Sequence, residues 1–179
     1  MAYLSRLSLI NFRNFTELEV DLPLGVVVFT GANAQGKTTL LEAAYLLAIA
    51  RSFRAENERE LINFSAGLNG EQALVRGVVE KKDQRLSVNV GYQSTATPGS
   101  TATSVDALGY SVRKQIRVNR IRYTAADLVG MVGAVLFSAD DIDLVYGAPS
   151  GRRRYLDILI SQADPPYIKA LQRYQRVLQ

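Results

Sequence analysis

One eight-residue stretch near the start of the chain has the spacing of a phosphate-binding loop. It reads Gly31-Ala32-Asn33-Ala34-Gln35-Gly36-Lys37-Thr38, which is the pattern G-x-x-x-x-G-K-T. Backbone N–H groups in such a loop form an anion cradle, and the following helix adds its positive dipole end. Lys37 supplies an ammonium for the β- and γ-phosphates, and the Thr38 hydroxyl offers a ligand to Mg²⁺. We therefore expect a nucleoside triphosphate such as ATP or GTP, with Mg²⁺, to bind between Gly31 and Thr39.

The segments on either side of this loop match its need for a strand before it and a helix after it. Residues 26–30 are a continuous apolar run, which is typical of a strand buried on both faces of a sheet. Residues 38–50 are rich in Leu and Ala without Gly or Pro, which predicts a helix. Residues 3–10 and 15–22 predict an antiparallel strand pair upstream, and residues 133–137 predict a second buried strand.

The remainder of the chain alternates between further strands and helices. We predict strands at 72–82 and 84–92 around a turn at Lys82-Asp83, and at 110–113, 115–118 and 121–123, with a turn at Asn119-Arg120. The Ser/Thr/Pro-rich residues 93–103 predict a surface loop, and Thr124 suits the N-cap of a short helix reaching residue 129. Helices are expected at 149–163 and from Pro165 to the last residue, so we predict an ATP-binding lobe at 1–148 and the beginning of a helical lobe at 149–179.

Composition excludes several kinds of chemistry. The 179 residues contain no Cys and no His, so disulfides, thiolate sites and imidazole bases are absent. A net charge of +4 is compatible with a polyanionic partner without demonstrating one. The longest apolar run, residues 40–50, is interrupted by Glu42 and is too short to span a membrane, and no signal peptide is visible, so we expect a cytoplasmic protein.

The carboxylate that P-loop ATPases use beside the loop is not evident. The best candidate follows the apolar residues 135–137, but two residues separate that run from Asp140 and Asp141. Both aspartates fit better as helix-start residues, which the helix dipole favours. No LSGG-like signature occurs, so we assign no catalytic residue within this chain and expect negligible ATP turnover from it alone.

Several segments together resemble the RecF family, in the SMC-type branch of the ABC ATPases. They are residues 9–15 (LINFRNF), the P-loop with its helix start, residues 51–54 (RSFR), residues 135–142 and residues 151–157 (GRRRYLD). The resemblance runs from Tyr3 to Leu178 and weakens between about residues 80 and 117. The chain departs from the family where Ala34 replaces the usual Gly and where Ala139-Asp140 replaces the usual Pro-Glu.

The resemblance implies an α/β fold, the ABC-type P-loop ATPase head lobe. It has a mixed sheet around the P-loop helix, an antiparallel β-subdomain, and C-terminal helices that begin a second lobe. RecF-like proteins are about twice this length and carry their signature motif, Walker B carboxylate and D-loop in the second half. The resemblance therefore implies an N-terminal fragment with half of a split site.

The same resemblance implies ATP-dependent binding of double-stranded DNA by a homodimer that sandwiches two ATP molecules. RecF-like proteins act in recombinational repair at gaps and stalled forks with RecO and RecR, assist RecA loading, and have a slow, DNA-stimulated ATPase. The alternatives are another SMC-type head, a stand-alone P-loop kinase or GTPase, and a module in which ATP only gates protein contacts. A kinase or GTPase would need an N-K-x-D motif or an arginine-rich lid, and the chain shows neither.

Arginines and the aspartate pair are the remaining candidate site residues. Contact with DNA or nucleotide is considered for Arg13, Arg51, Arg54, Arg152, Arg153 and Arg154. Each group also has a purely structural interpretation. Arg13 could be a solvated residue of the hairpin turn, Arg51 and Arg54 could complement the dipole at the end of the preceding helix, and residues 152–154 could form salt bridges between the lobes. Asp140 or Asp141 could also stand where ABC proteins place a Q-loop residue that touches Mg²⁺ or water, although N-capping is favoured.

Overall fold

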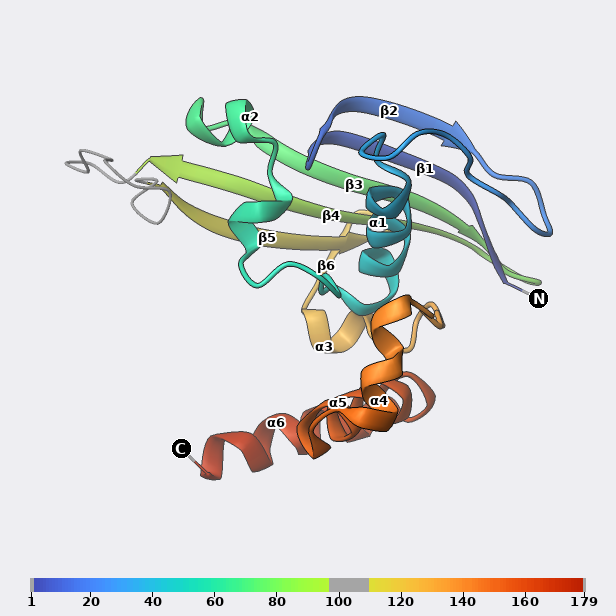
Figure 1. The fold of residues 1–179 in the computed structure, drawn as a ribbon, viewed down its shortest axis with the longest axis vertical. Helices are drawn as coiled ribbons and strands as arrows, with labels where there is room; N and C mark the ends of the chain where they lie inside the picture. Colours follow the sequence, from blue (N-terminus) through green and yellow to red (C-terminus); the bar gives the residue numbers. More distant parts are fainter. Residues whose placement is uncertain (1, 97–109, 179) are drawn as a thin grey trace.

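The computed structural model describes residues 2–96 and 110–178, and its centre is a six-stranded antiparallel sheet (Figure 1). The strands lie in the order β2-β1-β3-β4-β5-β6. Their bounds are β1 (Tyr3–Phe12), β2 (Phe15–Asp21), β3 (Gln72–Glu80), β4 (Arg85–Ala96), β5 (Tyr110–Val118) and β6 (Ile121–Tyr123). The predicted turn at Asn119-Arg120 is confirmed, with both residues in the left-handed region that a two-residue hairpin turn requires.

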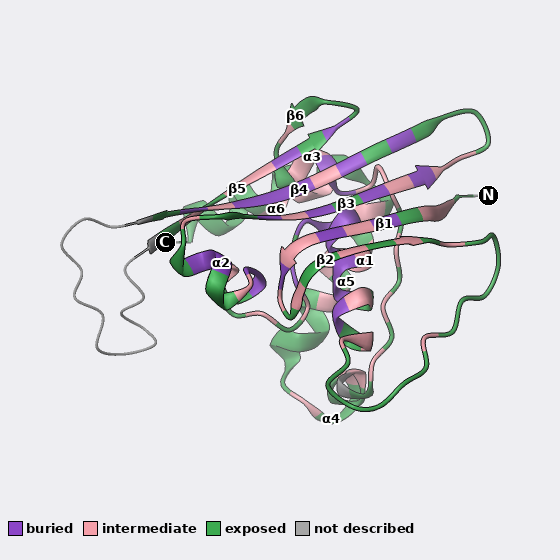
Figure 2. Cartoon of the chain, turned by 90° about the horizontal axis from the view of Figure 1, so that it is seen from above, coloured by how far each residue is buried: buried purple, intermediate pink, exposed green. Residues whose placement is uncertain are grey.

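One face of this sheet is apolar because alternate residues of each strand point to the same side. On β3 the inward residues Ala73, Val75 and Val79 are almost fully buried, whereas Gln72 and Arg76, which alternate with them, are exposed. Helix α1 (Lys37–Ile49) covers the apolar face, contributing Ala43, Leu46 and Leu47 to the core (Figure 2). The helix that follows the P-loop is therefore held directly against β1, β3 and β4.

Two short elements close one end of the α1–sheet layer. They are the 3₁₀ helix η1 (Glu58–Leu61) and helix α2 (Phe64–Leu68). Asn57 caps η1 by accepting from the N–H of Arg59, and the Glu60 side chain accepts from the N–H of Asn57, which completes a capping box. This segment is thereby fixed in front of the P-loop.

The C-terminal part is helical. It comprises α3 (Ala125–Leu128), the 3₁₀ helix η3 (Ala139–Ile142), α4 (Asp143–Tyr146), α5 (Pro149–Ala163) and α6 (Pro165–Val177). Figure 1 shows α4, α5 and α6 grouped beyond one edge of the sheet, with α3 between them and the strands. The predicted Thr124 cap of α3 and the helices after residues 149 and 165 are confirmed. No helix among residues 2–96 and 110–178 is long and apolar enough to cross a membrane.

The expected α/β fold class is confirmed, but the sheet is antiparallel throughout the described residues, and two predicted buried strands are wrong. Residues 26–30 and 133–137 have no regular secondary structure and do not pair into the sheet. Val26, Val28 and Phe137 are 91%, 73% and 89% exposed. An apolar run becomes a strand only where neighbouring strands satisfy its N–H and C=O groups, and the described chain places no strand beside these two runs.

The other differences concern element lengths. The predicted loop at 93–103 is wrong at its start, because β4 continues to Ala96 in register with β5; residues 97–103 lie outside the described part. The two short strands predicted at 110–113 and 115–118 form the single strand β5. Helix α6 ends at Val177, slightly earlier than expected.

Candidate nucleotide-binding site

The P-loop connects residues 26–30 to helix α1 through a backbone that passes repeatedly through left-handed conformations. Gly31, Ala34 and Gly36 have φ angles of 147°, 64° and 93°. Gly36 is the N-cap of α1, and no side chain caps this helix end. The first N–H groups of α1 thus lack a side-chain acceptor, and such groups together with the helix dipole suit a bound anion.

Lys37 lies across the loop that precedes it. Its Nζ donates to the carbonyl oxygens of Gly31 and Ala32 at 2.8 and 2.7 Å. These two bonds hold the ammonium over the loop rather than letting it extend into solvent. Thr38, the predicted Mg²⁺ ligand, is exposed beside it, whereas the next residue, Thr39, is buried in the packed face of α1.

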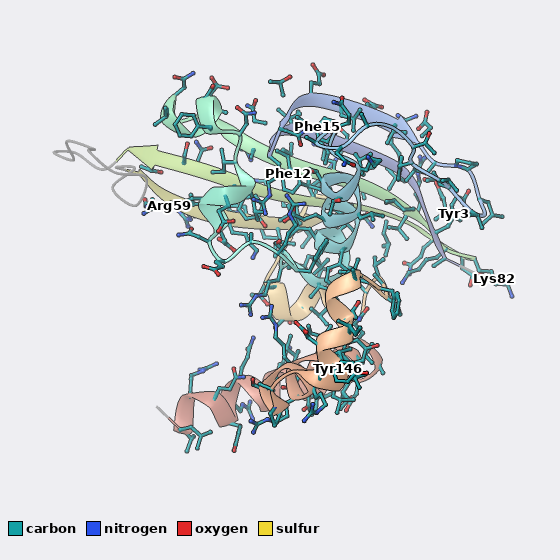
Figure 3. The ribbon with its side chains drawn as sticks, viewed as in Figure 1. Tyr3, Phe12, Phe15, Arg59, Lys82 and Tyr146 are labelled. Atoms are coloured by element: carbon teal, nitrogen blue, oxygen red, sulfur yellow. The ribbon has the colours of Figure 1, made fainter. Side chains whose placement is uncertain are left out.

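The turn between β1 and β2 supports the loop from behind. A Cβ atom at Gly36 would lie 2.6 Å from Cζ of Phe15 and 3.0 Å from Nδ2 of Asn14. Figure 3 labels Phe15 at the start of β2. Side chains larger than hydrogen at position 36 are therefore excluded by contact as well as by the positive φ angle. The close approach of Phe15 and Asn14 to Gly36 thus links the β1–β2 hairpin to the P-loop.

A cleft of about 1030 Å³ opens between the P-loop and the segment around η1. One wall consists of residues 33–39 with Arg13 and Asn14. The opposite wall is formed by residues between 54 and 64, namely Arg54, Glu56, Asn57, Arg59, Glu60, Ile62 and Phe64. The cleft has the size of a small-molecule site and combines cationic, amide and apolar groups, which suits a nucleotide.

Glu42 joins three separate segments beside this cleft. Its side chain is fully buried on α1, one turn after Thr38, and accepts from Nε and Nη2 of Arg13 at 3.0 and 2.7 Å. The Ser52 hydroxyl donates to Glu42 at 2.5 Å, and Nε of Arg54 lies 3.5 Å away. A buried carboxylate needs such partners, because desolvation of an unpaired charge is strongly unfavourable.

The pairing with Glu42 determines where Arg13 and Arg54 point. The Arg13 side chain is only 15% exposed, and its other neighbour is Glu60 at 3.5 Å. Both arginines line the cleft while their guanidinium groups are directed to carboxylates of the protein. Nucleotide contact by either residue stays a prediction, and their observed role is to hold the hairpin and the residue 52–54 segment against α1.

The outer wall is also tied to the sheet. Nζ of Lys114 on β5 donates to Glu58 of η1 at 2.6 Å and lies 5.9 Å from the centre of the Tyr92 ring. The Tyr92 hydroxyl is buried without a hydrogen-bond partner among the described residues, and its burial raises the pKa of Tyr92. The outer wall of the cleft is therefore fixed to strand β5 of the sheet.

Three other predicted site residues meet at a different place. Arg51, Asp141 and Arg154 line a cavity of about 180 Å³ between the end of α1 and α5, and this cavity shares no lining residue with the cleft. Asp141 accepts from the N–H of Ser138 at the start of η3, which is the capping role expected for it. The side chain of Asp140 lies outside the described part of the structure.

The arginine run at the start of α5 has mixed surroundings. Nη1 of Arg152 donates to the carbonyl oxygens of Leu144 and Gly147 at 3.4 and 3.0 Å, so it closes the C-terminal end of α4. Arg153 and Arg154 are exposed. A DNA-binding role for these three residues stays a prediction.

Sequence reasoning did not identify the wall opposite the P-loop or the residue that connects the walls. Asn57, Ile62 and Phe64 carry no motif beyond the N-x-x-E capping box, which predicts a helix start and not a binding site. Glu42 could have been noticed as a lone charge on the buried face of an apolar helix. Among the described residues, no group of three or more Asp and Glu side chains is arranged to hold a metal ion by itself.

Comparisons with known proteins agree with this geometry. The AAA domain family matches residues 6–125. DNA replication and repair protein RecF of Herpetosiphon aurantiacus is 42% identical over 98% of this chain and 46% of its own length, and RecF of Roseiflexus castenholzii is 42% identical over 99% and 44%. A solved structure of the recombination mediator protein RecF-ATP in the RecFOR pathway superposes with a TM-score of 0.80 at 34% identity, covering 98% of this chain and 42% of the other. The chain thus spans less than half the length of the proteins it matches.

Proposed function

Because this chain belongs to the AAA domain family and is a homologue of RecF along nearly its whole length, we propose that it is the ATP-binding part of a RecF-like DNA repair protein. The observation that carries the proposal is the P-loop, whose uncapped helix end and positioned lysine face a nucleotide-sized cleft. The structural relative bound to ATP supports ATP as the nucleotide.

In this proposal, N–H groups between Gly31 and Thr39 bind the phosphates, and Lys37 neutralises the β- and γ-phosphate charge. The Thr38 hydroxyl, exposed at the start of α1, would hold the Mg²⁺ that accompanies ATP. The ion pairs of Arg13 and Arg54 with Glu42 hold the β1–β2 turn and the residue 52–54 segment against α1 beside the cleft. The groups that complete hydrolysis are expected outside these residues.

We further propose that the protein binds double-stranded DNA when ATP is bound, dimerises around two ATP molecules, and acts with RecO and RecR in the cytoplasm to assist RecA loading. The named pathway of the structural relative and the positive net charge of +4 support this extension. We retain the boundary between an ATP-binding lobe, residues 1–148, and a helical lobe from residue 149, because α5 begins there.

Replacement of the P-loop lysine tests the ATP-binding proposal. Lys37→Ala removes a charge-assisted contact to phosphate, which is worth about 1.5–3 kcal/mol, so we expect the Kd for Mg-ATP to rise roughly tenfold or more. Isothermal titration calorimetry of the chain with Mg-ATP measures this change. Lys82→Ala, in the exposed turn between β3 and β4, is the matched control and should leave the Kd unchanged. Equal affinities for Lys37→Ala and the unmodified chain would exclude the site.

A further inference from the structure

The face of the sheet opposite α1 carries a set of arginines that are not paired within the described residues. Arg76, Arg113, Arg117 and Arg122 are exposed, and none of them makes a hydrogen bond or ion pair with residues 2–96 or 110–178. We call these four residues the arginine face. Arg113, Arg117 and Arg122 lie close together in sequence on the β5–β6 hairpin, and Arg76 comes from β3, earlier in the chain.

Strand register aligns three of the four. Arg76 on β3 lies opposite Asn89 on β4, Asn89 lies opposite Arg117 on β5, and Arg117 lies opposite Arg122 on β6. Directly paired residues of antiparallel strands share one face. The row from Arg76 to Arg122 crosses three strand spacings, about 14 Å, and Arg113 lies four residues, about 13 Å, from Arg117 along β5. The result is a cationic field that extends across β3 to β6.

This arrangement is unfavourable for the isolated protein. Like charges placed directly opposite each other on neighbouring strands repel, as Arg117 and Arg122 must. The same sheet neutralises its other outward arginines. Arg6 on β1 pairs with Glu19 and Asp21 of β2 at 3.0 and 2.6 Å, and Arg85 pairs with Glu80 at 3.0 Å. The arginine face is the part of this sheet surface where several strand arginines lie together without carboxylate partners in the described structure, which points to an external anion.

The groups between the arginines indicate which anion. The intervening outward positions on β4 and β5 are Ser87, Asn89, Gly91, Gln93 and Gln115, which are polar or small. Protein interfaces depend on buried aromatic or aliphatic anchors. On this face, aliphatic side chains are limited to the β3 side, where Leu74 and Val78 are half-buried beside Arg76, and the positions on β4 and β5 offer none. Interfaces with DNA are polar and strongly positive, and Arg, Asn and Gln side chains commonly donate to phosphate oxygens.

We propose that the arginine face binds the phosphate backbone of double-stranded DNA. The inference rests on the proposed DNA-binding function and adds the surface through which it acts. The field is about as wide as a groove of B-form DNA, so its arginines reach phosphates on both strands that border one groove. Contacts of this kind position the duplex without reading its sequence. Binding through this face is therefore sequence-independent and sensitive to salt.

The test measures the salt dependence of duplex binding in the presence of Mg-ATP. Fluorescence anisotropy of the chain with a labelled duplex of about 30 base pairs gives the slope of log K against log salt, which falls by about 0.9 for each phosphate contact removed. The double variant Arg117→Gln/Arg122→Gln should bind more weakly and lose about 1.8 from the magnitude of the slope. Both side chains are exposed, so circular dichroism should show an unchanged fold.

The matched control is Arg6→Gln/Arg85→Gln, which removes the same charge from the same sheet at arginines paired with carboxylates. We expect its slope to equal that of the unmodified chain. Equal losses in the two double variants would show a net-charge effect and overturn the assignment, as would an unchanged slope in Arg117→Gln/Arg122→Gln. Failure of the unmodified chain to bind the duplex would overturn the arginine face as a DNA-binding surface, whereas the ATP-binding function, measured separately by calorimetry, would stand.

Discussion

Ala34 occupies a backbone position that L-residues seldom adopt. Its φ angle of 64° lies in the left-handed region, where a Cβ atom crowds the following carbonyl at a cost of about 1–2 kcal/mol. The P-loop needs this conformation to turn its N–H groups inward, so the strain is a consequence of anion binding. The Gly expected here from the family resemblance would adopt the same path without strain.

Ala34→Gly should therefore stabilise the chain. Relief of the left-handed strain exceeds the entropy that Gly adds to the unfolded state, and we expect the free energy of unfolding to rise by about 0.5–1 kcal/mol. Urea denaturation followed by circular dichroism measures this change. Ala32→Gly is the matched control in the same loop, where φ is not positive, and it should lower the free energy of unfolding by about 0.4–1 kcal/mol. A loss of stability in both variants would mean that Ala34 carries no strain.

Residue types alone predicted the loop well and its support poorly. Gly31, Gly36, Lys37 and Thr38 stand in a fixed local spacing, so their roles could be inferred from neighbours in the chain. Glu42 differs, because its partners Arg13 and Ser52 are 29 and 10 residues away. Long-range pairing of this kind depends on the packing of α1 against the hairpin, which no local pattern encodes.

At the scale of elements, the antiparallel strands were predictable and the two apolar runs were not. The residues of β3 alternate between buried and exposed, and that period of two is visible in the sequence. Residues 26–30 and 133–137 are apolar at nearly every position, a pattern that predicts burial on both faces but does not say what provides it. Whether such a run becomes a strand depends on a pairing partner elsewhere in the chain. The apolar composition of these two runs therefore could not show that they lack a partner strand in the described structure, and the strand predictions were wrong.

The packing of α1 on the sheet depends on a glycine. A Cβ atom at Gly77 of β3 would lie 2.3 Å from Cδ1 of Leu47 and 2.9 Å from Cδ1 of Leu4. Leu47 is 1% exposed, so it cannot move into solvent to make room. The helix that carries the P-loop thus approaches β3 as closely as the absence of a side chain permits.

Gly77→Ala should separate α1 from the sheet and lower the free energy of unfolding by about 1–3 kcal/mol, as overpacking of a core does. Thermal and urea denaturation measure the loss, and the Kd for Mg-ATP should rise because the P-loop moves with α1. The control is Gly151→Ala on α5, where a Cβ atom meets nothing within 4 Å. Removing a Gly from a helix should raise the free energy of unfolding by about 0.8–1 kcal/mol. Tolerance of Ala at both positions would show that Leu47 repacks freely.

At the scale of the whole molecule, the sheet layer and the C-terminal helices are joined by a few polar contacts. The N–H of Ala134 donates to Oε1 of Gln162 on α5 at 2.8 Å, and Nζ of Lys169 on α6 lies 3.0 Å from Asp127 on α3. Much of the apolar surface near this junction is exposed, including Phe137, Val145 and Leu156. These polar contacts add to the apolar residues of α1 and α5 around the smaller cavity in fixing the C-terminal helices relative to the sheet.

Asp127 makes one of these contacts depend on pH. The Thr124 hydroxyl donates to its carboxylate at 2.6 Å, and together with Lys169 this lowers the pKa of Asp127. A carboxyl group with a lowered pKa in the folded state stabilises the fold above its unfolded pKa, about 3.9. That stabilisation disappears as the pH falls through the lower folded value. Acid should therefore loosen the junction between α3 and α6.

Comparison of Asp127→Asn with the unmodified chain isolates this effect from the titration of other carboxylates. We expect the variant to be less stable at pH 7, and the difference in unfolding free energy to shrink as the pH is lowered below about 4. Asp83→Asn is the control, because Asp83 lies exposed in the turn between β3 and β4 without a hydrogen bond or ion pair to the described residues, and this variant should be as stable as the unmodified chain at pH 7. Amide hydrogen exchange in α6 should be faster in Asp127→Asn than in the unmodified chain at pH 7. Faster exchange there would locate the loss of stability at the contact between α3 and α6. A stability difference that persists unchanged in acid would mean that Asp127 acts through its neutral hydrogen bonds to Thr124 and not through its charge.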